Sequence, residues 1–506
     1  MLSPTALIWR RFRMVARSSA TPANIRYTHS TGKLIPLVID GHDASSTATF
    51  PVVSPLTGRE VWSAASASPQ NVCDAIDAAQ RAFPAWSRTK PAERRDILLR
   101  AADRMVQRKD ELADYMRVEI GATRDYQDFI LGLAIEGLKD TAGRITQAVQ
   151  GYVPDSMHKG MRAMVWKRPY GVILGIAPWN APYHLGLRAI TSAIAAGNTA
   201  VLKGSELSPR CYWAFTDVLR EAGLPNGCLN LLFHQPADAA AITESLVEHP
   251  HVKKINFTGS TKVGAVIAAA AGRHLKPVLM ELGGKANALV LADADLHLAA
   301  QQCMMGAFVN TGQICMSTER ILVHSSVADE FQSILADTIR QTFTEEPPVL
   351  VTAQSAQRNR DLVTDAVAKG ARVLCGTTHA EQPRGEVAAE MSPIVLGNVD
   401  QTMSLYRTES FGPSVSLFTF DTEEEALALA NDTEYGLAAS VFTRDLNTAF
   451  RVSERLDSGA VHINSMTVHD EFALPHGGVK QSGFGRFNGA QGLDEFLYTK
   501  SVTWME

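Results

Sequence analysis

One cysteine of this chain stands in a setting suited to chemistry. The stretch NTGQICMSTER sets Cys315 between a glycine-containing turn and a polar segment. A thiol attacks carbon only as the thiolate, and an electropositive setting or the oriented amides of a turn lower its pKa. Cys303, in AAQQCMMGAF, lies in an apolar helical stretch and is expected to pack in the core. The pattern favours Cys315 as a nucleophile, and an inert structural thiol is the alternative.

The composition favours small-molecule chemistry. A chain of 506 residues exceeds what one hydrophobic core organises, so we expect two or more domains. A charged fraction of 20% and a net charge of -5 argue against nucleic-acid binding, and no run of apolar residues is long enough to predict a membrane span. Six scattered cysteines without a CxxC pair indicate free thiols in a reducing compartment, and no metal site is expected.

The first 35 residues differ from the rest of the chain. They are rich in arginine, serine and threonine, and no acidic residue occurs before Asp40. This composition is typical of a mitochondrial transit peptide, so the sequence predicts a mitochondrial protein. The alternative is a disordered basic leader on a cytoplasmic protein.

The middle of the chain alternates strands with helices. Apolar strand patterns are followed by helical stretches after Pro182, Ser208, Ala237 and Thr261, and the strands read GVILGIA, TAVLKG, CLNLLF, KKINF and PVLMEL. Parallel strands need crossover helices that cover both faces of a sheet. The alternation therefore predicts an α/β, Rossmann-like, doubly wound parallel sheet, whose common ligand is a nucleotide at the carboxyl ends of the strands.

The flanking regions are expected to complete the architecture. LIPLVIDG and TATFPVVSPLTGREVWSA predict an entry hairpin, followed by helices over about 69–85 and 91–119. Residues from about 295 to 487 mix helices and strands and predict a second α/β domain. The final FLYTKSVTWM alternates like a strand and needs an edge to pair with, which a partner subunit could supply.

Two loops of the predicted sheet are candidates for binding a nucleotide. No strict GxGxxG exists; the nearest pattern is FTGSTKVG, where a strand turns into a helix whose N-terminus could hold a pyrophosphate. Glu206, in VLKGSE, ends another strand, and a carboxylate there accepts from ribose hydroxyls and repels a 2′-phosphate. The cofactor predicted from Glu206 is NAD, with a plain turn and a solvated charge as the alternatives.

Six motifs in one order carry a family resemblance. They are PWNAP, FTGS, ELGGK, GQIC, ESFGP and GGVKQSGFGR. With these, the chain after its leader resembles the aldehyde dehydrogenase superfamily along essentially its whole length. Glu281 and Cys315 stand at the separation typical of that family's base and nucleophile.

The resemblance implies a mechanism. Cys315 attacks the aldehyde carbon to form a thiohemiacetal, whose oxyanion accepts from the Asn180 side chain and the backbone N–H of Cys315. Hydride passes to the nicotinamide, and Glu281 activates the water that hydrolyses the acyl thioester. Without the motifs, Asn180 reads as a turn residue and Glu281 as a surface carboxylate.

The resemblance also implies cofactor contacts. Lys203 and Glu206 lie on the adenine ribose, Ser260 at the pyrophosphate, and Glu409 with Phe411 at the nicotinamide ribose and ring. Further residues at the cofactor are Ile176, Trp179 and Gly259. Gly204 replaces a frequent proline and is expected to loosen its loop slightly.

Departures from the family pattern bear on the proton path and the substrate. A lysine and a glutamate proposed to relay the general base's proton are replaced by Ala189 and Phe487, so Glu281 must lose its proton by another path. Arg188 and His476 resemble the branch of salicylaldehyde, vanillin and benzaldehyde dehydrogenases. A guanidinium and an imidazole can hydrogen-bond a phenolic oxygen. The alternatives are an aliphatic aldehyde or a semialdehyde as substrate, or a thiol esterase.

The resemblance divides the chain into parts. A leader occupies residues 1–35, a catalytic domain 283–490, an NAD-binding domain 36–147 with 170–282, and an oligomerisation arm 148–169 with 491–506. A homodimer or homotetramer is expected, with no nucleic acid or membrane as partner.

Overall fold

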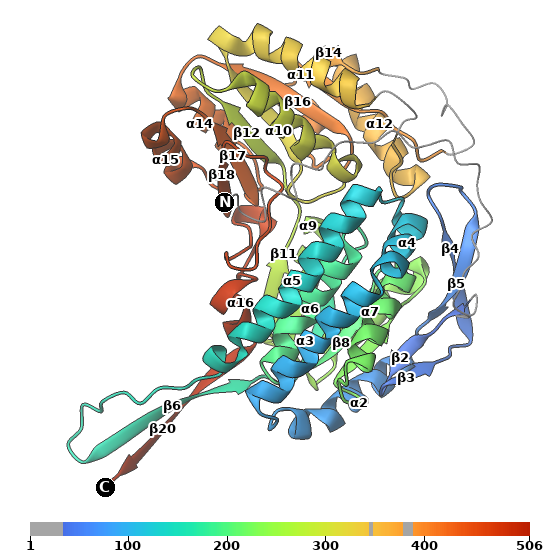
Figure 1. The fold of residues 1–506 in the computed structure, drawn as a ribbon, viewed down its shortest axis with the longest axis vertical. Coiled ribbons are helices and arrows are strands. Elements are labelled where there is room, and N and C mark those ends of the chain that lie inside the picture. The colour runs from blue at the N-terminus through green and yellow to red at the C-terminus, as the bar shows by residue number, and fades with distance from the viewer. Residues whose placement is uncertain (1–33, 344–347, 378–387) are drawn as a thin grey trace.

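A computed structural model describes residues 34–343, 348–377 and 388–506 of the chain (Figure 1). Nearly all of the predicted leader lies outside these residues. Its last two residues do not belong to a leader, because Leu34 and Ile35 form β1 and pair with β5. The fold is α/β, as predicted.

An eight-stranded sheet forms the core of the lower body in Figure 1. Its strands, in spatial order, are β19 (Gly483–Phe484), β11 (Val278–Glu281), β10 (Val252–Thr258), β7 (Val172–Ile176), β8 (Thr199–Lys203), β9 (Leu229–Leu232), β2 (Leu37–Ile39) and β3 (His42–Ala44). The five strands predicted from apolar runs are β7 to β11, and they pair in parallel. The doubly wound parallel sheet is therefore confirmed.

Helices cover both faces of this sheet. Those of the body are α2 (Pro69–Trp86), α3 (Pro91–Gln107), α4 (Lys109–Ile120), α5 (Arg124–Ala148), α6 (Pro182–Ala195), α7 (Pro209–Glu221), α8 (Ala239–Glu248), α9 (Thr261–Arg273) and α16 (Gly489–Asp494), with the 3₁₀ turn η1 (Pro236–Asp238). α6 and α7 pack on one face beneath α3, α4 and α5, while α2, α8 and α9 contact the strands from the other. The long helix predicted from Pro91 divides at Arg108, which ends α3 and precedes α4.

A seven-stranded sheet forms the second lobe. In spatial order it contains β14 (Arg372–Cys375), β15 (Ile394–Gly397), β16 (Ser414–Phe420), β13 (Thr318–His324), β12 (Ala286–Val290), β17 (Ala438–Phe442) and β18 (Ala460–Ile463). Side chains alternate across it. Ala288 and Val290 of β12 pack toward α10 and α11, whereas Leu289 packs toward α14 and α15.

The elements around this sheet complete the lobe. They are α10 (Leu296–Phe308), α11 (Ala328–Thr342), α12 (Ala353–Ala368), α13 (Ser404–Arg407), α14 (Glu423–Asn431), α15 (Leu446–Arg455), η2 (Val309–Gly312), η3 (Ser325–Val327) and η4 (Lys480–Ser482). The predicted second α/β region is present. The residue boundaries of the domains stay a prediction; β19, within the range 283–490 predicted for the catalytic domain, pairs in the first sheet.

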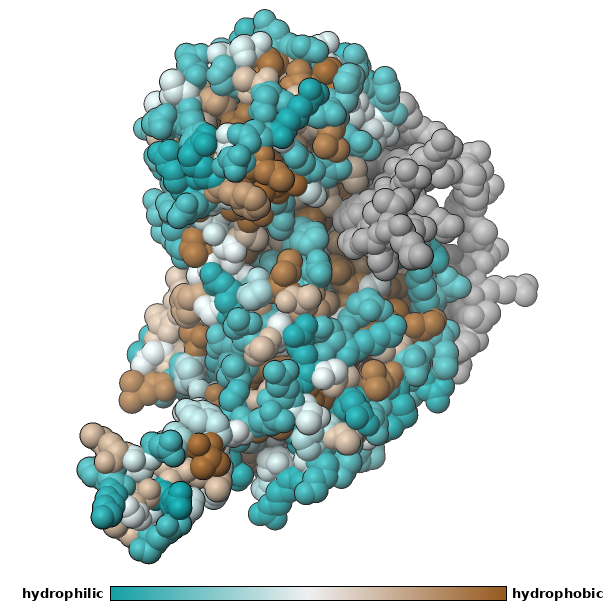
Figure 2. Space-filling view, turned by 60° about the vertical axis from the view of Figure 1, so that its left-hand side comes forward, coloured by the Kyte–Doolittle hydropathy of each residue, from teal (hydrophilic) through white to brown (hydrophobic). Residues whose placement is uncertain are grey.

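Two small sheets lie at the margins. β1 (Leu34–Ile35), β5 (Glu60–Ser66) and β4 (Ala48–Val53) form one, in which β4 and β5 are the predicted hairpin. β6 (Met161–Pro169) and β20 (Leu497–Met505) form a ribbon that stands clear of the body (Figures 1 and 2). Trp166, Trp504 and Met505 of this ribbon are exposed.

Candidate active site

The two sheets meet where one short loop passes between them. β11 ends at Glu281 in the first sheet, and β12 begins at Ala286 in the second. Ala286 lies opposite Thr318 of β13, so the loop runs beside Cys315. A Cβ on Gly284 would lie 2.1 Å from the carbonyl oxygen of Cys315. Glycine at position 284 is therefore what lets the Glu281 loop approach the cysteine.

Cys315 follows a strained turn. Asn310, Thr311 and Gly312 are all left-handed, with φ of 50°, 58° and 73°. Side-chain bonds fix the turn: Gln313 Nε2 donates to the Asn310 carbonyl (3.0 Å), and Thr311 Oγ1 donates to the Val349 carbonyl (3.1 Å). Such backbone strain persists where the surroundings over-determine it, often at functional sites.

The Asn180 amide is held beside this turn. Its Nδ2 donates to the carbonyl of Gln313 at 3.0 Å, and Tyr126 donates its hydroxyl to the Asn180 carbonyl at 3.0 Å. An amide nitrogen carries two N–H groups, so one remains for an oxyanion near Cys315. The structure thus brings together Asn180 and Cys315.

Glu281 is fully buried next to Cys315. Its Oε2 accepts from Arg188 Nη2 at 2.9 Å, and its Oε1 has no hydrogen-bond partner among the described residues. Burial, followed by the negative charge of Glu281, raises the pKa of the Cys315 thiol well above its ordinary value, and the Arg188 charge opposes this. The sequence predicted that a polar setting lowers this pKa, whereas in the structure burial and the Glu281 carboxylate act in the opposite direction.

Arg188 occupies the region that the family pattern associates with proton transfer. Nη2 bonds Glu281, Nη1 bonds Asp470 Oδ2 at 2.9 Å, and the guanidinium carbon lies 4.6 Å from the centre of the Phe487 ring. Only Nε lacks a partner within the described chain. Arg188 is thus mainly engaged by protein carboxylates.

His476 is buried on the same side of the site. Its backbone pairs with Phe487, and its Nδ1 lies 3.9 Å from Asp470 Oδ1. Burial lowers the pKa of His476, although Asp470 opposes the shift, so the imidazole is neutral near pH 7. Nε2 has no partner among the residues described.

The carboxyl ends of three strands gather the predicted cofactor residues. Ile176 of β7 lies opposite Lys203 of β8 and Phe257 of β10. Strand order reverses between β7 and β10, and ligands of open α/β sheets bind in the crevice at such a point. Burial lowers the pKa of Lys203, and the nearby charge of Glu206 opposes this. Lys203 and Glu206 therefore lie together at the sheet edge.

The loops beyond these strands complete the edge. Ser260 caps α9 by accepting from Val263, and the Gly259 N–H donates to the Glu281 carbonyl at 3.1 Å. The Trp179 and Phe411 rings meet edge to face at 5.8 Å. A helix N-terminus, a hydroxyl and aromatic rings of this kind fit a nicotinamide nucleotide.

Glu409 lies on the other side of the Glu281 loop. Its Oε1 accepts from the Gly284 N–H at 2.9 Å. Burial, reinforced by the charge of Glu319, raises the pKa of Glu409 to about 8. Glu409 is therefore largely protonated at neutral pH, which its sequence did not indicate.

A buried ion pair that sequence reasoning missed fixes the Phe411 turn. Lys285 Nζ lies 2.5 Å from Glu319 Oε2, and Glu319 accepts from the backbone N–H groups of Ser410 (2.9 Å) and Phe411 (3.2 Å). Phe411 is left-handed, with φ of 50°. A charge in each of the ELGGK and STER motifs was the available signal.

Comparison with known proteins identifies the family. The model of the Aldehyde dehydrogenase family matches residues 42–502. The chain belongs to the aldehyde dehydrogenase family. It is an oxidoreductase acting on aldehydes with a nicotinamide cofactor, which confirms the resemblance and the enzyme class predicted from the motifs.

Relatives within the aldehyde dehydrogenase family match over most of their length. A vanillin dehydrogenase of Pseudomonas fluorescens is 45% identical over 93% of this chain and 97% of its own. A salicylaldehyde dehydrogenase of Pseudomonas putida is 37% identical over 91% and 95%. The crystal structure of a salicylaldehyde dehydrogenase from Pseudomonas putida G7 complexed with salicylaldehyde superposes with a TM-score of 0.89 at 36% identity, covering 94% of this chain and 98% of that one.

These relatives correct one prediction. They come from Pseudomonas, and bacteria have no mitochondria, so the mitochondrial assignment read from the leader is wrong. The cytoplasmic alternative fits the relatives better. Composition misled here because an arginine-rich, acid-poor segment is not specific to transit peptides.

Two features are absent from the described residues. No helix among them has the length and apolar character to cross a membrane. Across the same residues, no group of three or more His, Cys, Asp or Glu side chains is arranged to hold a metal ion.

Proposed function

We propose that this aldehyde dehydrogenase oxidises an aromatic aldehyde to the acid, with NAD as cofactor and Cys315, Glu281 and Asn180 as catalytic residues. The observation that carries the proposal is the meeting of these three side chains at the junction of the two sheets, beside the β7 and β10 strand ends. A nicotinamide nucleotide at that edge supplies the acceptor for the electron pair of the aldehyde C–H bond.

Attack begins at the thiol. Because its raised pKa keeps Cys315 protonated, the neighbouring Glu281 takes the thiol proton as the sulfur–carbon bond forms. The carbonyl electron pair moves to oxygen, which accepts from the second N–H of Asn180. A nicotinamide bound there would accept the aldehyde hydrogen together with its electron pair as hydride, which would leave the acyl group on sulfur as a thioester.

Release of the acid uses Glu281 again. Glu281 first passes the thiol proton to solvent. As a carboxylate it then takes a proton from water while the new carbon–oxygen bond forms, and this proton goes to the cysteine sulfur as the carbon–sulfur bond breaks. Oε1 is the oxygen available for this proton, because Oε2 is bonded to Arg188. Cys315 thereby returns to its starting form, and the carboxylic acid is released as the product.

Support for an aromatic substrate comes from buried polar atoms and from the relatives. His476 Nε2 and Arg188 Nε are buried without partners in the described chain, and a ring hydroxyl or methoxy oxygen could bond such groups. The relatives are named for vanillin and salicylaldehyde, two substituted benzaldehydes. Arg188 contributes one nitrogen at most, so His476 carries more of this proposal.

A substrate panel tests the proposal. Formation of reduced nicotinamide is followed by its absorbance with salicylaldehyde, vanillin, benzaldehyde and hexanal. We expect kcat/KM for the ring aldehydes to exceed that for hexanal. A tenfold preference for hexanal would remove the aromatic assignment and leave an aliphatic aldehyde dehydrogenase.

The preference for NAD rests on Glu206. Its carboxylate beside Lys203 would repel the 2′-phosphate of NADP. We expect kcat/KM with NAD to exceed that with NADP at least tenfold, and Glu206→Gln to narrow the ratio. An unchanged ratio in the variant would exclude Glu206 as the discriminating residue.

A homodimer or homotetramer assembled through the ribbon of β6 and β20 completes the proposal. An isolated two-stranded ribbon is marginal in water, and this one exposes Trp166, Trp504 and Met505. A second subunit could cover these side chains. Light scattering of the intact chain tests this, and a monomer at micromolar concentration would refute it.

A further inference from the structure

A second buried carboxylate lies behind Glu281. The guanidinium of Arg188 bridges the two, with Nη2 2.9 Å from Glu281 Oε2 and Nη1 2.9 Å from Asp470 Oδ2. All three side chains are at most 4% exposed. The Arg188 guanidinium therefore bonds two carboxyl groups, those of Glu281 and Asp470, in a setting from which water is largely excluded.

Asp470 is fixed by groups from several elements. His184 Nε2 from α6 lies 2.7 Å from Oδ2, and Asn488 Nδ2 donates to Oδ1 at 2.7 Å. His476 faces the same carboxylate. Burial alone would raise the pKa of Asp470, but His476, His184 and Arg188 together lower it well below its ordinary value. The carboxylate is thus charged and held rigidly.

We propose that Asp470 is a positioning residue that acts through Arg188 to hold Glu281 by one oxygen and leave the other free for the proton of the hydrolytic water. The inference rests on the proposed role of Glu281 as the general base. Asp470 itself does not touch the substrate or the reacting atoms in this proposal.

The argument depends on the shape of the guanidinium. A guanidinium facing a single carboxylate commonly donates two parallel hydrogen bonds that occupy both oxygens. Here Asp470 accepts at Nη1, so only Nη2 reaches Glu281. Glu281 Oε1 consequently has no partner in the described structure. Without Asp470, both ends of the fork could turn to Glu281 and occupy the oxygen that catalysis needs.

Charge leads to the same expectation. The charged groups around Glu281 are Arg188 and Asp470, with the titratable Cys315 and His476 nearby. The negative charge of Asp470 offsets part of the attraction that Arg188 exerts on Glu281. Neutralising Asp470 would leave that attraction undivided. The acid limb of the hydrolysis rate would then move to lower pH.

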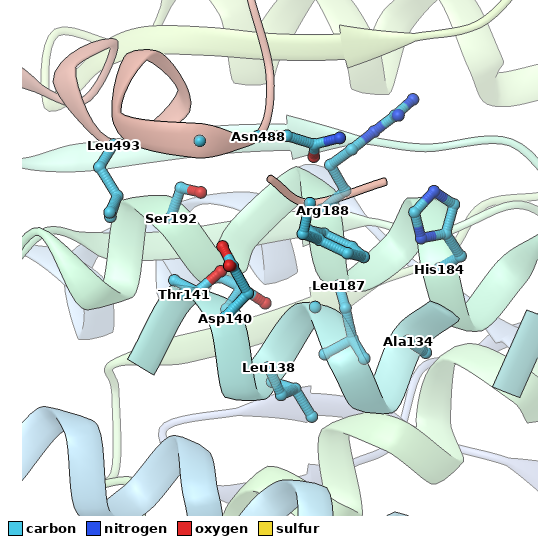
Figure 3. A pocket seen from close by; sticks show the side chains of 14 residues that line it. Ala134, Leu138, Asp140, Thr141, His184, Leu187, Arg188, Ser192, Asn488 and Leu493 are labelled. Atoms are coloured by element: carbon cyan, nitrogen blue, oxygen red, sulfur yellow. The ribbon is translucent and has the colours of Figure 1, made fainter. Parts of the chain in front are cut away.

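A cavity beside this cluster provides a matched control. It encloses about 410 Å³, including space open to solvent, between α5, α6 and α16 (Figure 3). His184, Arg188 and Asn488 line one side, and the Arg188 side chain extends away from Asp140 on α5. The Asp140 carboxylate is bonded to Arg144 of its own helix. Asp140→Asn therefore makes the same chemical change near the cavity without touching the pair formed by Arg188 and Glu281.

The test compares Asp470→Asn with Asp140→Asn in the full chain. For Asp470→Asn we expect a burst of reduced nicotinamide within about threefold of the unmodified rate, a kcat at least tenfold lower, and an acid limb of kcat about one pH unit lower. Asp140→Asn should change none of these. A structural role alone would lower kcat without moving the acid limb, so an unmoved limb overturns the inference.

Arg188→Gln gives a second, opposite expectation. Removing the cation leaves two buried carboxylates facing each other, so the acid limb should move up by about one pH unit or more. Arg188→Gln serves as the test if Asp470→Asn does not melt cooperatively and is therefore not properly folded. In that case, an acid limb of kcat that is unmoved or shifted to lower pH in Arg188→Gln overturns the inference. Glu281→Gln distinguishes a failure of the proposed base role of Glu281 from a failure of the proposed positioning role of Asp470. Full turnover in that variant refutes the base assignment itself, whereas slow turnover beside a normal Asp470→Asn refutes only the role of Asp470.

Discussion

Two carboxylates flank the cysteine loop in different surroundings. Glu281 is fully buried and paired with a guanidinium. Glu409 is held by the backbone N–H of Gly284, and burial raises its pKa to about 8. Both raise the pKa of Cys315, Glu281 more than Glu409. The contrast teaches that burial and a neighbouring carboxylate can hold a glutamate such as Glu409 largely protonated even where a backbone N–H opposes this.

The largest effect should come from removing the Cys315 thiol, whose pKa both carboxylates influence. Cys315→Ala deletes the sulfur that forms the thioester, so neither the burst nor steady turnover can occur. We expect a loss of at least about a thousandfold in kcat, measured by absorbance of the reduced nicotinamide. Cys303→Ala is the matched control, because that thiol lies on α10 and is buried in the core shared with α11. Substantial activity in Cys315→Ala would remove the basis of the comparison.

Replacing the carboxylate on the guanidinium side should have the next largest effect. Glu281→Gln removes the general base but keeps the side-chain shape. Since general-base catalysis contributes about 10² to 10⁴, we expect kcat to fall by at least a hundredfold. A burst should remain but be slower, because Glu281 also takes the thiol proton. Rapid-mixing absorbance separates the two phases. Loss of the burst together with kcat would mean that Glu281 acts mainly on the thiol.

Replacing the carboxylate on the amide side should have a small, pH-dependent effect. With a pKa of about 8, Glu409 is mostly protonated below that pH, and Gln resembles the protonated form. Glu409→Gln should stay within about threefold of the unmodified kcat at pH 7 and diverge as pH rises above 8. A pH profile of both enzymes measures this. A large deficit at pH 6 that does not grow with pH would contradict the protonated form.

The smallest effect concerns the thiol itself. Because the pKa of Cys315 is raised, its alkylation by iodoacetamide without cofactor should be slow at pH 7 and increase steadily with pH. Glu281→Gln should accelerate alkylation at pH 7 several-fold, and Glu409→Gln less, following their influence on the thiol. Peptide mass spectrometry at Cys315 reads the rates. Faster alkylation in Glu409→Gln than in Glu281→Gln would contradict the larger influence of Glu281 on the pKa of Cys315.

Local patterns predicted the scaffold well. The apolar runs around Ile176, Lys203 and Glu281 are β7, β8 and β11, because buried parallel strands need continuous apolar residues. The motifs gave Cys315 and Asn180, and the structure brings both to one junction. Those assignments depended on short stretches whose residues act near one another in sequence.

Long-range partners could not be read from the sequence. Asp470 meets His184 across 286 positions and Arg188 across 282. The stretch TVHDE, residues 467–471, does not indicate which residues Asp470 contacts. The partners of the Asp470 carboxylate become evident only when α6 packs beside it. The Cys315 pKa was misjudged for the same reason, because Glu281 reaches the thiol only when the two sheets meet.

The ribbon of β6 and β20 pairs two strands that are synthesised at different times. Met161 pairs with Met505 and Pro169 with Leu497, so β6 leaves the ribosome long before its partner strand. Until then β6 has an open edge that any exposed strand could occupy. A nascent chain must therefore keep this edge of β6 apart from other exposed strands until β20 has been synthesised.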